Sequence, residues 1–295
     1  MQVTLSNPII AHRGAGALAP ENTLPAYQAA YQLGAPMIEV DAWRTTDGKL
    51  VIMHDDTVDR TTSGKGRVDS FSFDQLRRLD AGSWFGSQFK GAQVPTLGEV
   101  LDYARGKMKV DIHVREADNY PGLEKDVVDL IHQKKAEDNV LVTAFEPAFL
   151  KKVHDLDPNL ATGTLLDTHP LLNTVKKGVE VGLGVGAIVG LASGVGLLGA
   201  AAVALAGGIA GFVASREAGL KSVRDQLAHT DTPVVLPFWA QCDSRFMAEA
   251  SAEGKQVIPY VTDAPALVDW MLHRDGVSAV ITDNAERFQN EMHAG

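Results

Sequence analysis

The chain has 295 residues, 45% of them hydrophobic and 22% charged, which is ordinary for a globular protein with a large apolar core. Its formal net charge of −10, without any long basic run, argues against a nucleic-acid partner, because such partners are bound through a basic surface. The single cysteine, Cys242, excludes an intramolecular disulfide and fits a reducing compartment.

The opening residues, Met1–Pro8, lack the basic and apolar regions of a secretory signal, so we expect a cytoplasmic protein. Beyond them, short apolar runs alternate with longer amphipathic ones, which predicts βα units and a mainly parallel sheet. We expect strands at Ile9–His12, Met37–Asp41, Leu50–His54, Val110–Val114, Val140–Phe145, Ala161–Leu166, Val234–Phe238, Gln256–Val261 and Ala279–Thr282. We expect helices at Leu24–Leu33, Thr96–Tyr103, Leu123–Lys134, Pro147–Leu156, Ser244–Glu253, Pro265–Arg274 and Ala285–Met292.

The second and third of these strands are joined by a short turn, Arg44–Lys49. A turn of this length cannot carry a parallel crossover, so we expect Leu50–His54 to form an antiparallel hairpin with Met37–Asp41. The remaining strands suffice for an α/β fold of the TIM (β/α)8 barrel type, in a single domain spanning residues 1–295. The stretch 57–109 is longer than an ordinary βα connection and predicts a small insertion on the barrel rim.

An unusual run, Val181–Ser215, contains 35 residues without a charge, ten of them glycine. We expect an apolar, glycine-rich helical hairpin over residues 178–216, with its turn near Ser193–Leu197. Both flanks belong to one barrel, so a single membrane span is excluded, whereas two short helices that fold back can dip into a bilayer. The alternatives are a homo-oligomer interface and a flexible linker. Four flanking cations favour a cytosolic position of both ends: Lys176, Lys177, Arg216 and Lys221.

Ionisable residues occupy the ends of the early strands, where burying an unpaired charge is unfavourable. Glu39 and Asp41 lie two residues apart and share one face of a strand, and so do Asp111 and His113. In a barrel that face points into the lumen near the carboxyl-terminal mouth, where active sites lie. The sequence therefore predicts that these side chains converge.

Three carboxylates in one place repel one another unless a cation neutralises them. Oxygen ligands alone suit Mg²⁺ or Ca²⁺ better than zinc. Such an ion, together with Arg13, would neutralise a phosphate group. The strand-end histidines His12 and His54 could then divide the work of base or nucleophile and of acid towards a departing alcohol.

The strings HRG, PENT, EVD, VIMHDDTVDRTTSGKG and VPTLGEVL occur in this order, and QVIPYVTD and GVSAVITDN follow near the end. This pattern resembles the glycerophosphodiester phosphodiesterase family over Ile9–Leu166 and again over Val234–Phe288. The resemblance implies a TIM barrel with a small insertion after the second strand. It also implies hydrolysis of a glycerophosphodiester to glycerol 3-phosphate and an alcohol.

Residue by residue, the resemblance implies that His12 and His54 are the paired acid and base. Glu39 and Asp41 match metal-binding carboxylates, and Asp111 stands where the family usually has a metal-binding glutamate. The resemblance also places two residues along the phosphate and metal site, Arg13 and Glu21.

The chain departs from this family at three points. Asp111-Ile112-His113 stands in place of Glu-Ile-Lys, so a cationic phosphate contact becomes the titratable His113. Tyr260 replaces a tryptophan near the penultimate strand, and we expect it to contact substrate. The uncharged run Val181–Ser215 is absent from the family's ordinary soluble members, which leaves the substrate open.

The leading hypothesis is a phosphodiesterase held on the cytosolic face of a membrane through Val181–Ser215. It would act on glycerophosphodiesters and on lysophospholipids, the latter in a phospholipase D-like cleavage. The second hypothesis is an enzyme for soluble substrates such as glycerophosphocholine, whose hairpin serves only anchoring or assembly. The third, a non-catalytic membrane scaffold, is disfavoured because both histidines and all three carboxylates are present.

Overall fold

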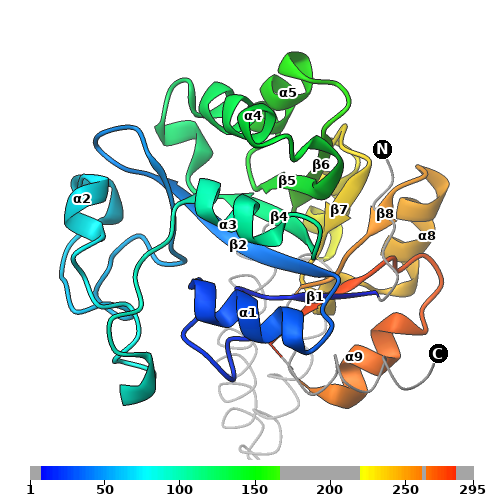
Figure 1. The fold of residues 1–295 in the computed structure, drawn as a ribbon. Coiled ribbons are helices and arrows are strands. Elements are labelled where there is room, and N and C mark those ends of the chain that lie inside the picture. The colour runs from blue at the N-terminus through cyan, green and yellow to red at the C-terminus, as the bar shows by residue number, and fades with distance from the viewer. Residues whose placement is uncertain (1–7, 167–219, 261–263, 284–295) are drawn as a thin grey trace, which may run out of the picture. The chain divides into compact units, whose positions relative to one another are not determined.

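A computed structural model describes residues 8–166, 220–260 and 264–283 (Figure 1). The chain divides into two compact units. The first holds residues 1–165, 231–239 and 250–295, and the second holds residues 166–230 and 240–249. The single-domain boundaries expected from the sequence stay a prediction.

All the described strands belong to the first unit and form one sheet. Their order is β8-β7-β6-β5-β4-β2-β1-β9, and β3 pairs with β2 outside this path. The strands are β1 (Ile9–Ala11), β2 (Met37–Arg44), β3 (Leu50–Ile52), β4 (Lys109–Val114), β5 (Val140–Ala144), β6 (Ala161–Leu165), β7 (Val234–Leu236), β8 (Gln256–Val257) and β9 (Val280–Thr282).

Neighbouring strands along this path are parallel, whereas β3 is antiparallel to β2. The predicted hairpin is therefore confirmed. The two ends of the path also meet, because the N–H of Ser278 donates to the carbonyl of Val257 and that of Ile281 to the carbonyl of Pro259, each at 2.9 Å. The sheet thus has the eight parallel strands of the predicted TIM barrel.

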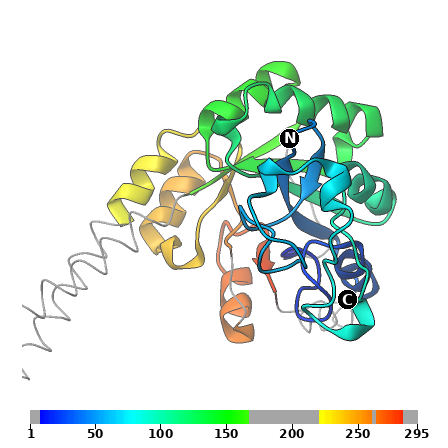
Figure 2. The ribbon, with the colours of Figure 1, turned by 90° about the vertical axis from the view of Figure 1, so that its left-hand side faces the viewer.

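Helices α1, α4, α5 and α9 lie outside the strands (Figures 1 and 2). The helices with described bounds are α1 (Leu24–Gln32), α2 (Phe73–Leu76), α3 (Leu97–Ala104), α4 (Leu123–Lys134), α5 (Pro147–Leu156), α8 (Ser244–Ala252) and α9 (Pro265–Leu272). Short 3-10 helices occur at Val68–Ser70, Ser87–Phe89, Ala117–Asn119, Glu137–Asn139 and Trp239–Gln241. The predicted helix at Ala285–Met292 lies outside the described residues.

The start of α3 shows why sequence signals can define a helix. Thr96 Oγ1 accepts the backbone N–H of Glu99 at 3.1 Å, and the Glu99 carboxylate accepts the N–H of Thr96 at 2.8 Å. This reciprocal capping satisfies backbone donors that the first helical turn leaves unpaired. Helices α4 and α5 have the bounds that the amphipathic pattern predicts.

The barrel interior is filled by one cluster of buried apolar side chains from its strands: Ile10, Met37, Leu141, Ala161, Leu165, Val234, Leu236, Ile258, Ala279 and Ile281. This cluster provides a closed hydrophobic floor. Polar groups at the carboxyl ends of the strands are therefore held by a packed core rather than by loops.

The stretch after β3 packs as a second cluster, to which β2 contributes Trp43 and β3 contributes Val51. The other buried members come from the segment between β3 and α3: Met53, Val58, Val68, Leu76, Ala81 and Val94. The excursion expected over residues 57–109 therefore rests on the β2–β3 hairpin. Its last part contains α3, and the bounds 57–109 of the insertion stay a prediction.

Among the described ranges, no helix is both long and apolar enough to cross a membrane. The glycine-rich run Val181–Ser215, expected to form a hairpin, lies outside those ranges.

Candidate active site at the carboxyl ends of the strands

Two neighbouring strands position a buried polar cluster. Strand β2 carries Glu39 and Asp41, and β4 carries Asp111 and His113. The parallel register places Glu39 opposite Asp111 and Asp41 opposite His113. All four side chains are buried. Because residues two apart on a strand share a face, the register brings the four side chains together, as the sequence predicts.

Three members of this cluster form a candidate metal site. Glu39, Asp41 and His113 each offer one ligand atom, and these atoms lie within 4.8 Å of one another. Nδ1 of His113 is 3.3 Å from Asp41 Oδ1 and 3.9 Å from Glu39 Oε1. The arrangement suits a divalent cation, because it concentrates negative charge where water is excluded.

The two carboxyl groups on β2 have opposite pKa shifts. Burial, and then the charges of Asp41 and Asp111, raise the pKa of Glu39 well above its ordinary value. Burial would also raise the pKa of Asp41, but contacts with His113, His54 and Arg13 outweigh it and lower that pKa. Without a cation the pair therefore tends to hold one proton, and a bound dication would let both carboxyl groups ionise.

Asp111 lies deeper along β4. Burial, with a further contribution from Asp41, raises its pKa to about 7, although a hydrogen bond from Thr143 opposes this. Thr143 Oγ1 donates to Asp111 Oδ1 at 2.7 Å, whereas Oδ2 has no hydrogen-bond partner among the described residues. Asp111 and Glu21 are not members of the three-residue group. Their assignment as metal ligands stays a prediction.

His12 follows β1 and is held by a residue from the far end of the chain. Its Nδ1 is 2.8 Å from Asp283 Oδ1, and its Nε2 is 4.0 Å from Glu39 Oε2. The carboxylate of Asp283 favours a proton on Nδ1, which directs Nε2 towards the buried cluster. The sequence analysis missed Asp283, which directly follows β9.

His54 follows β3 and has an analogous partner, since its Nδ1 is 2.7 Å from Asp55 Oδ1. Burial lowers the pKa of His54 below its ordinary value, and the charge of Asp41 opposes this only in part. Arg60 fixes the pair from outside, because it donates to both carboxylate oxygens of Asp55 at 2.7 and 3.0 Å. It also donates to both oxygens of Glu21 at 2.8 Å. The sequence analysis missed Arg60.

Arg13 contacts the carboxylates of the cluster. Its backbone N–H donates to Glu39 Oε2 at 3.0 Å, and its side chain donates to Glu21 Oε1 at 2.8 Å. Its φ of 54° is left-handed, a strained conformation for this residue type that often occurs at functional sites. The next residue, Gly14, has φ 83°, and a Cβ there would lie 2.8 Å from the backbone of Ala26.

A further polar support, also missed, comes from the PENT string. Asn22 donates from Nδ2 to Asp41 Oδ2 at 2.8 Å, while Tyr27 donates its hydroxyl hydrogen to Asn22 Oδ1 at 3.0 Å. This chain fixes the orientation of the Asp41 carboxylate.

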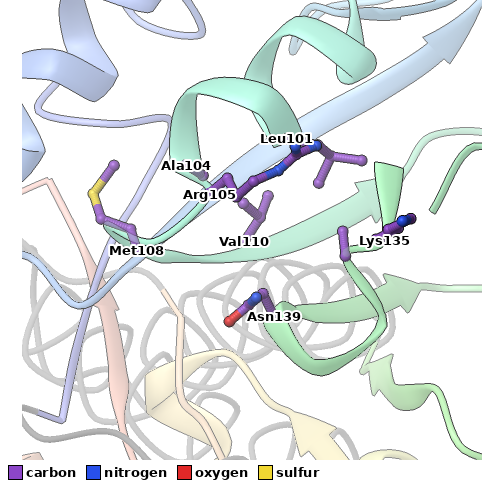
Figure 3. A pocket seen from close by; sticks show the side chains of 8 residues that line it. Leu101, Ala104, Arg105, Met108, Val110, Lys135 and Asn139 are labelled. Atoms are coloured by element: carbon purple, nitrogen blue, oxygen red, sulfur yellow. The ribbon is translucent and has the colours of Figure 1, made fainter. Parts of the chain in front are cut away.

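Tyr260 follows β8 and contacts Phe238 edge to face, with ring centroids 6.2 Å apart. It packs against the barrel-floor cluster, and its expected contact with substrate stays a prediction. A small pocket lies at the opposite, amino-terminal ends of β4 and β5 (Figure 3). Its volume of ≈ 10 Å³ has room for roughly one water. The buried cluster, rather than this pocket, is therefore the candidate active site.

The barrel and its polar cluster define a class of protein: a TIM barrel with paired imidazoles beside a candidate metal site. The model of the glycerophosphoryl diester phosphodiesterase family matches residues 12–189. The chain therefore belongs to that family.

Two relatives give the extent of the likeness. Glycerophosphodiester phosphodiesterase of Bacillus subtilis is 36% identical over 185 residues, which cover 58% of this chain and 63% of that protein. The protein of the same name from Caldanaerobacter subterraneus subsp. tengcongensis is 40% identical over 159 residues, covering 53% of this chain and 65% of that protein. The chain thus matches just under two thirds of each relative's length.

A solved structure supports the fold over almost the full length. The phosphodiesterase of Oleispira antarctica, in complex with the product sn-glycerol 3-phosphate, is 23% identical with a TM-score of 0.72. The likeness covers 98% of this chain and 97% of that chain. The predicted TIM barrel is therefore confirmed.

Proposed function

We propose that this chain hydrolyses glycerophosphodiesters to glycerol 3-phosphate and an alcohol. One observation carries the proposal: His12 and His54 each bind a carboxylate through Nδ1, next to buried, oppositely shifted carboxyl groups. A carboxylate on Nδ1 fixes the tautomer and leaves Nε2 for proton transfer, as in other acid–base sites. Family membership supports the same chemistry.

The two imidazoles differ in a way that suggests their roles. The lowered pKa of His54 keeps it neutral near pH 7, which suits the group that takes a proton from the attacking oxygen. His12 lies with its Nε2 4.0 Å from Glu39 Oε2 and is held through Nδ1 by Asp283, so its Nε2 faces the buried cluster. We assign the protonation of the departing alcohol to His12.

The remaining residues bind and orient the phosphate. Arg13 is the cation beside the cluster, and His113 and Tyr260 are further proposed contacts. A divalent cation bound by Glu39 and Asp41, with Asp111 and Glu21 as additional proposed ligands, would supply charge neutralisation for the phosphate oxygens. The donor set fits such an ion, since Asp111 Oδ2 is buried without a hydrogen-bond partner among the described residues.

A panel of glycerophosphodiesters and lysophospholipids, assayed with and without added divalent ions, tests this function. The variants His12→Ala and His54→Ala should lower kcat by about 10²–10⁴-fold, the usual contribution of general acid–base catalysis. His132→Ala is a matched control, because its imidazole binds Asp157 on the surface. Near-full activity of either active-site variant would show that the role assignment is wrong. Absence of hydrolysis across the whole panel would favour the non-catalytic scaffold.

The uncharged run Val181–Ser215 supports a finer proposal, that the enzyme meets lipid-borne substrates at a membrane. Its length, its glycines and its cationic flanks favour a hairpin that enters one leaflet. Deletion of the run should abolish co-sedimentation with liposomes and lysophospholipid cleavage, while hydrolysis of glycerophosphocholine persists. Unchanged sedimentation would leave the run as an assembly device, which size-exclusion chromatography of the same variant would reveal.

A further inference from the structure

His113 stands where the family that this chain resembles commonly has a lysine. It lies on β4 directly opposite Asp41, and its side chain is only 8% exposed. Its Nδ1 faces two carboxylates, at 3.3 Å from Asp41 Oδ1 and 3.9 Å from Glu39 Oε1. A lysine ammonium at this point could only form an ion pair, whereas an imidazole nitrogen carries a lone pair that can bind a metal ion.

The spacing of these atoms suits ligands of a common ion. Ligand atoms about 2.1 Å from a metal lie roughly 3.0 Å apart at right angles and roughly 3.4 Å apart in a tetrahedral arrangement. The separation between His113 Nδ1 and Asp41 Oδ1, 3.3 Å, falls in that range. It is also longer than the about 2.7–2.9 Å of a well-formed charge-assisted hydrogen bond. The nitrogen and the oxygen are thus better placed to share an ion than to bind each other.

Among the described residues, no hydrogen-bond partner competes for the other ring nitrogen. Nε2 of His113 is buried and forms no hydrogen bond with any residue that the structure describes. The ring meets Phe145 edge to face, with centroids 5.5 Å apart. Phe145 therefore packs against the ring, and the ion-pair contacts of the ring with described residues are those of Nδ1 with the two carboxylates.

We infer that His113 Nδ1 is a metal ligand alongside Glu39 and Asp41, and that the site selects Zn²⁺ or Co²⁺ over Mg²⁺ and Ca²⁺. The inference deepens the proposed function, since it concerns the same site, and it assigns His113 to the metal ion in place of the phosphate contact proposed above. Mg²⁺ and Ca²⁺ take oxygen ligands, whereas imidazole suits the softer first-row ions. The oxygen-only set that predicts Mg²⁺ or Ca²⁺ from sequence omits this nitrogen.

Pulsed electron paramagnetic resonance of the full chain loaded with Mn²⁺ tests ligation directly. Wild-type protein labelled with ¹⁵N-histidine should show a coupling between manganese and a directly bound histidine nitrogen. The variant His113→Asn, which replaces the nitrogen ligand by a neutral amide, should lose it, and the surface control His132→Asn should keep it. No coupling in the wild type, or a coupling that persists in His113→Asn, would overturn the inference.

Metal affinity provides a second, independent readout. Titration calorimetry of the metal-stripped protein should show that His113→Asn weakens Co²⁺ and Zn²⁺ binding by about 10–100-fold, while Mg²⁺ affinity changes by less than about threefold. Equal losses for all three ions would contradict a selective nitrogen ligand. Circular dichroism of the metal-stripped variant shows whether it is folded. If it is not, the electron paramagnetic resonance spectrum of the ¹⁵N-labelled wild type decides whether a histidine binds the metal.

Hydrolysis of glycerophosphocholine, measured on the same samples, separates the two proposals. Histidine coupling without hydrolysis would sink the proposed function and leave the ligand assignment intact. Hydrolysis without histidine coupling would support the proposed function and overturn the assignment of a histidine ligand.

Discussion

The buried carboxyl group of Asp111 makes the metal-free protein sensitive to pH, and Asp111→Asn should remove part of that sensitivity. Burial raises the pKa of Asp111 to about 7, with the charge of Asp41 adding to it. An aspartate in the unfolded chain has a pKa of about 3.9. Between these two values the folded chain keeps a proton that the unfolded chain has lost. Stability therefore falls as pH rises through this window.

The magnitude follows from the difference between the two pKa values. A difference of about 3 between the two pKa values corresponds to about 4 kcal/mol in the free energy of unfolding. The wild type is destabilised by this full amount above pH 7 and is not destabilised below pH 4. Asparagine has no such loss and keeps the hydrogen bond that Thr143 Oγ1 donates to Oδ1. Relative to the wild type, Asp111→Asn should thus gain up to about 4 kcal/mol of stability between pH 5 and pH 8.

Chemical unfolding in the presence of a chelator, followed by circular dichroism at several pH values, measures this gain. The exposed Asp138 provides the control, since Asp138→Asn changes the same charge at the surface. Stability curves of wild type and Asp111→Asn that run parallel from pH 5 to pH 8 would refute the reasoning. Added Mn²⁺ should narrow or reverse the difference if Asp111 is also a metal ligand, because the ion stabilises the ionised carboxylate.

Three further substitutions test the groups around the cluster. Asp283→Asn should lower kcat by about 10²-fold or more without changing metal affinity, because it disturbs the tautomer of His12. A rate within twofold of the wild type would show that Asp283 does not position His12. Asp55→Asn replaces the carboxylate whose hydrogen bond raises the pKa of His54 by a neutral amide. The acidic limb of the kcat/KM profile should therefore move to lower pH, and an unchanged limb would argue against His54 as the base. Gly14→Ala should destabilise the protein by more than about 1 kcal/mol, because φ of Gly14 is 83° and the new Cβ would lie 2.8 Å from the backbone of Ala26 in helix α1. Thermal unfolding measures this loss, and an unchanged unfolding midpoint would contradict the prediction.

The barrel could be predicted from sequence because its signals are local. Alternating apolar runs and amphipathic stretches predict the bounds of α4 and α5 to the residue. The short turn after β2 predicts that β3 is antiparallel to β2. The short helix α2 was not predicted. It has four residues, and Asp47, far along the chain, accepts the backbone N–H of its first residue, Phe73, at 3.0 Å. The helix also carries a local signal that the sequence analysis missed, a capping box formed by Ser72 and Gln75.

The candidate site was predictable where its residues lie at the ends of neighbouring strands. Glu39, Asp41 and His113 follow from residue spacing and from the parallel register of β2 and β4. Asp283 and Arg60 were missed for a different reason. Asp283 reaches His12 across 271 residues, because the last strand lies beside the first. Strand ends that meet only through barrel closure cannot be paired from residue spacing alone.

The strain around the cluster gives a physical reason to assign it to function rather than to stability. Buried carboxyl groups within reach of one another raise the free energy of the folded chain, and apolar side chains at these positions would avoid that. The surrounding donors Arg13, Asn22 and Thr143 satisfy only part of the cluster, since Asp111 Oδ2 and His113 Nε2 lack hydrogen-bond partners among the described residues. A ligand that carries two positive charges would neutralise the carboxyl groups that these donors satisfy only in part. The folded chain is therefore incomplete as a purely structural arrangement, and its stability should rise on binding a dication by an amount set by that ion's affinity.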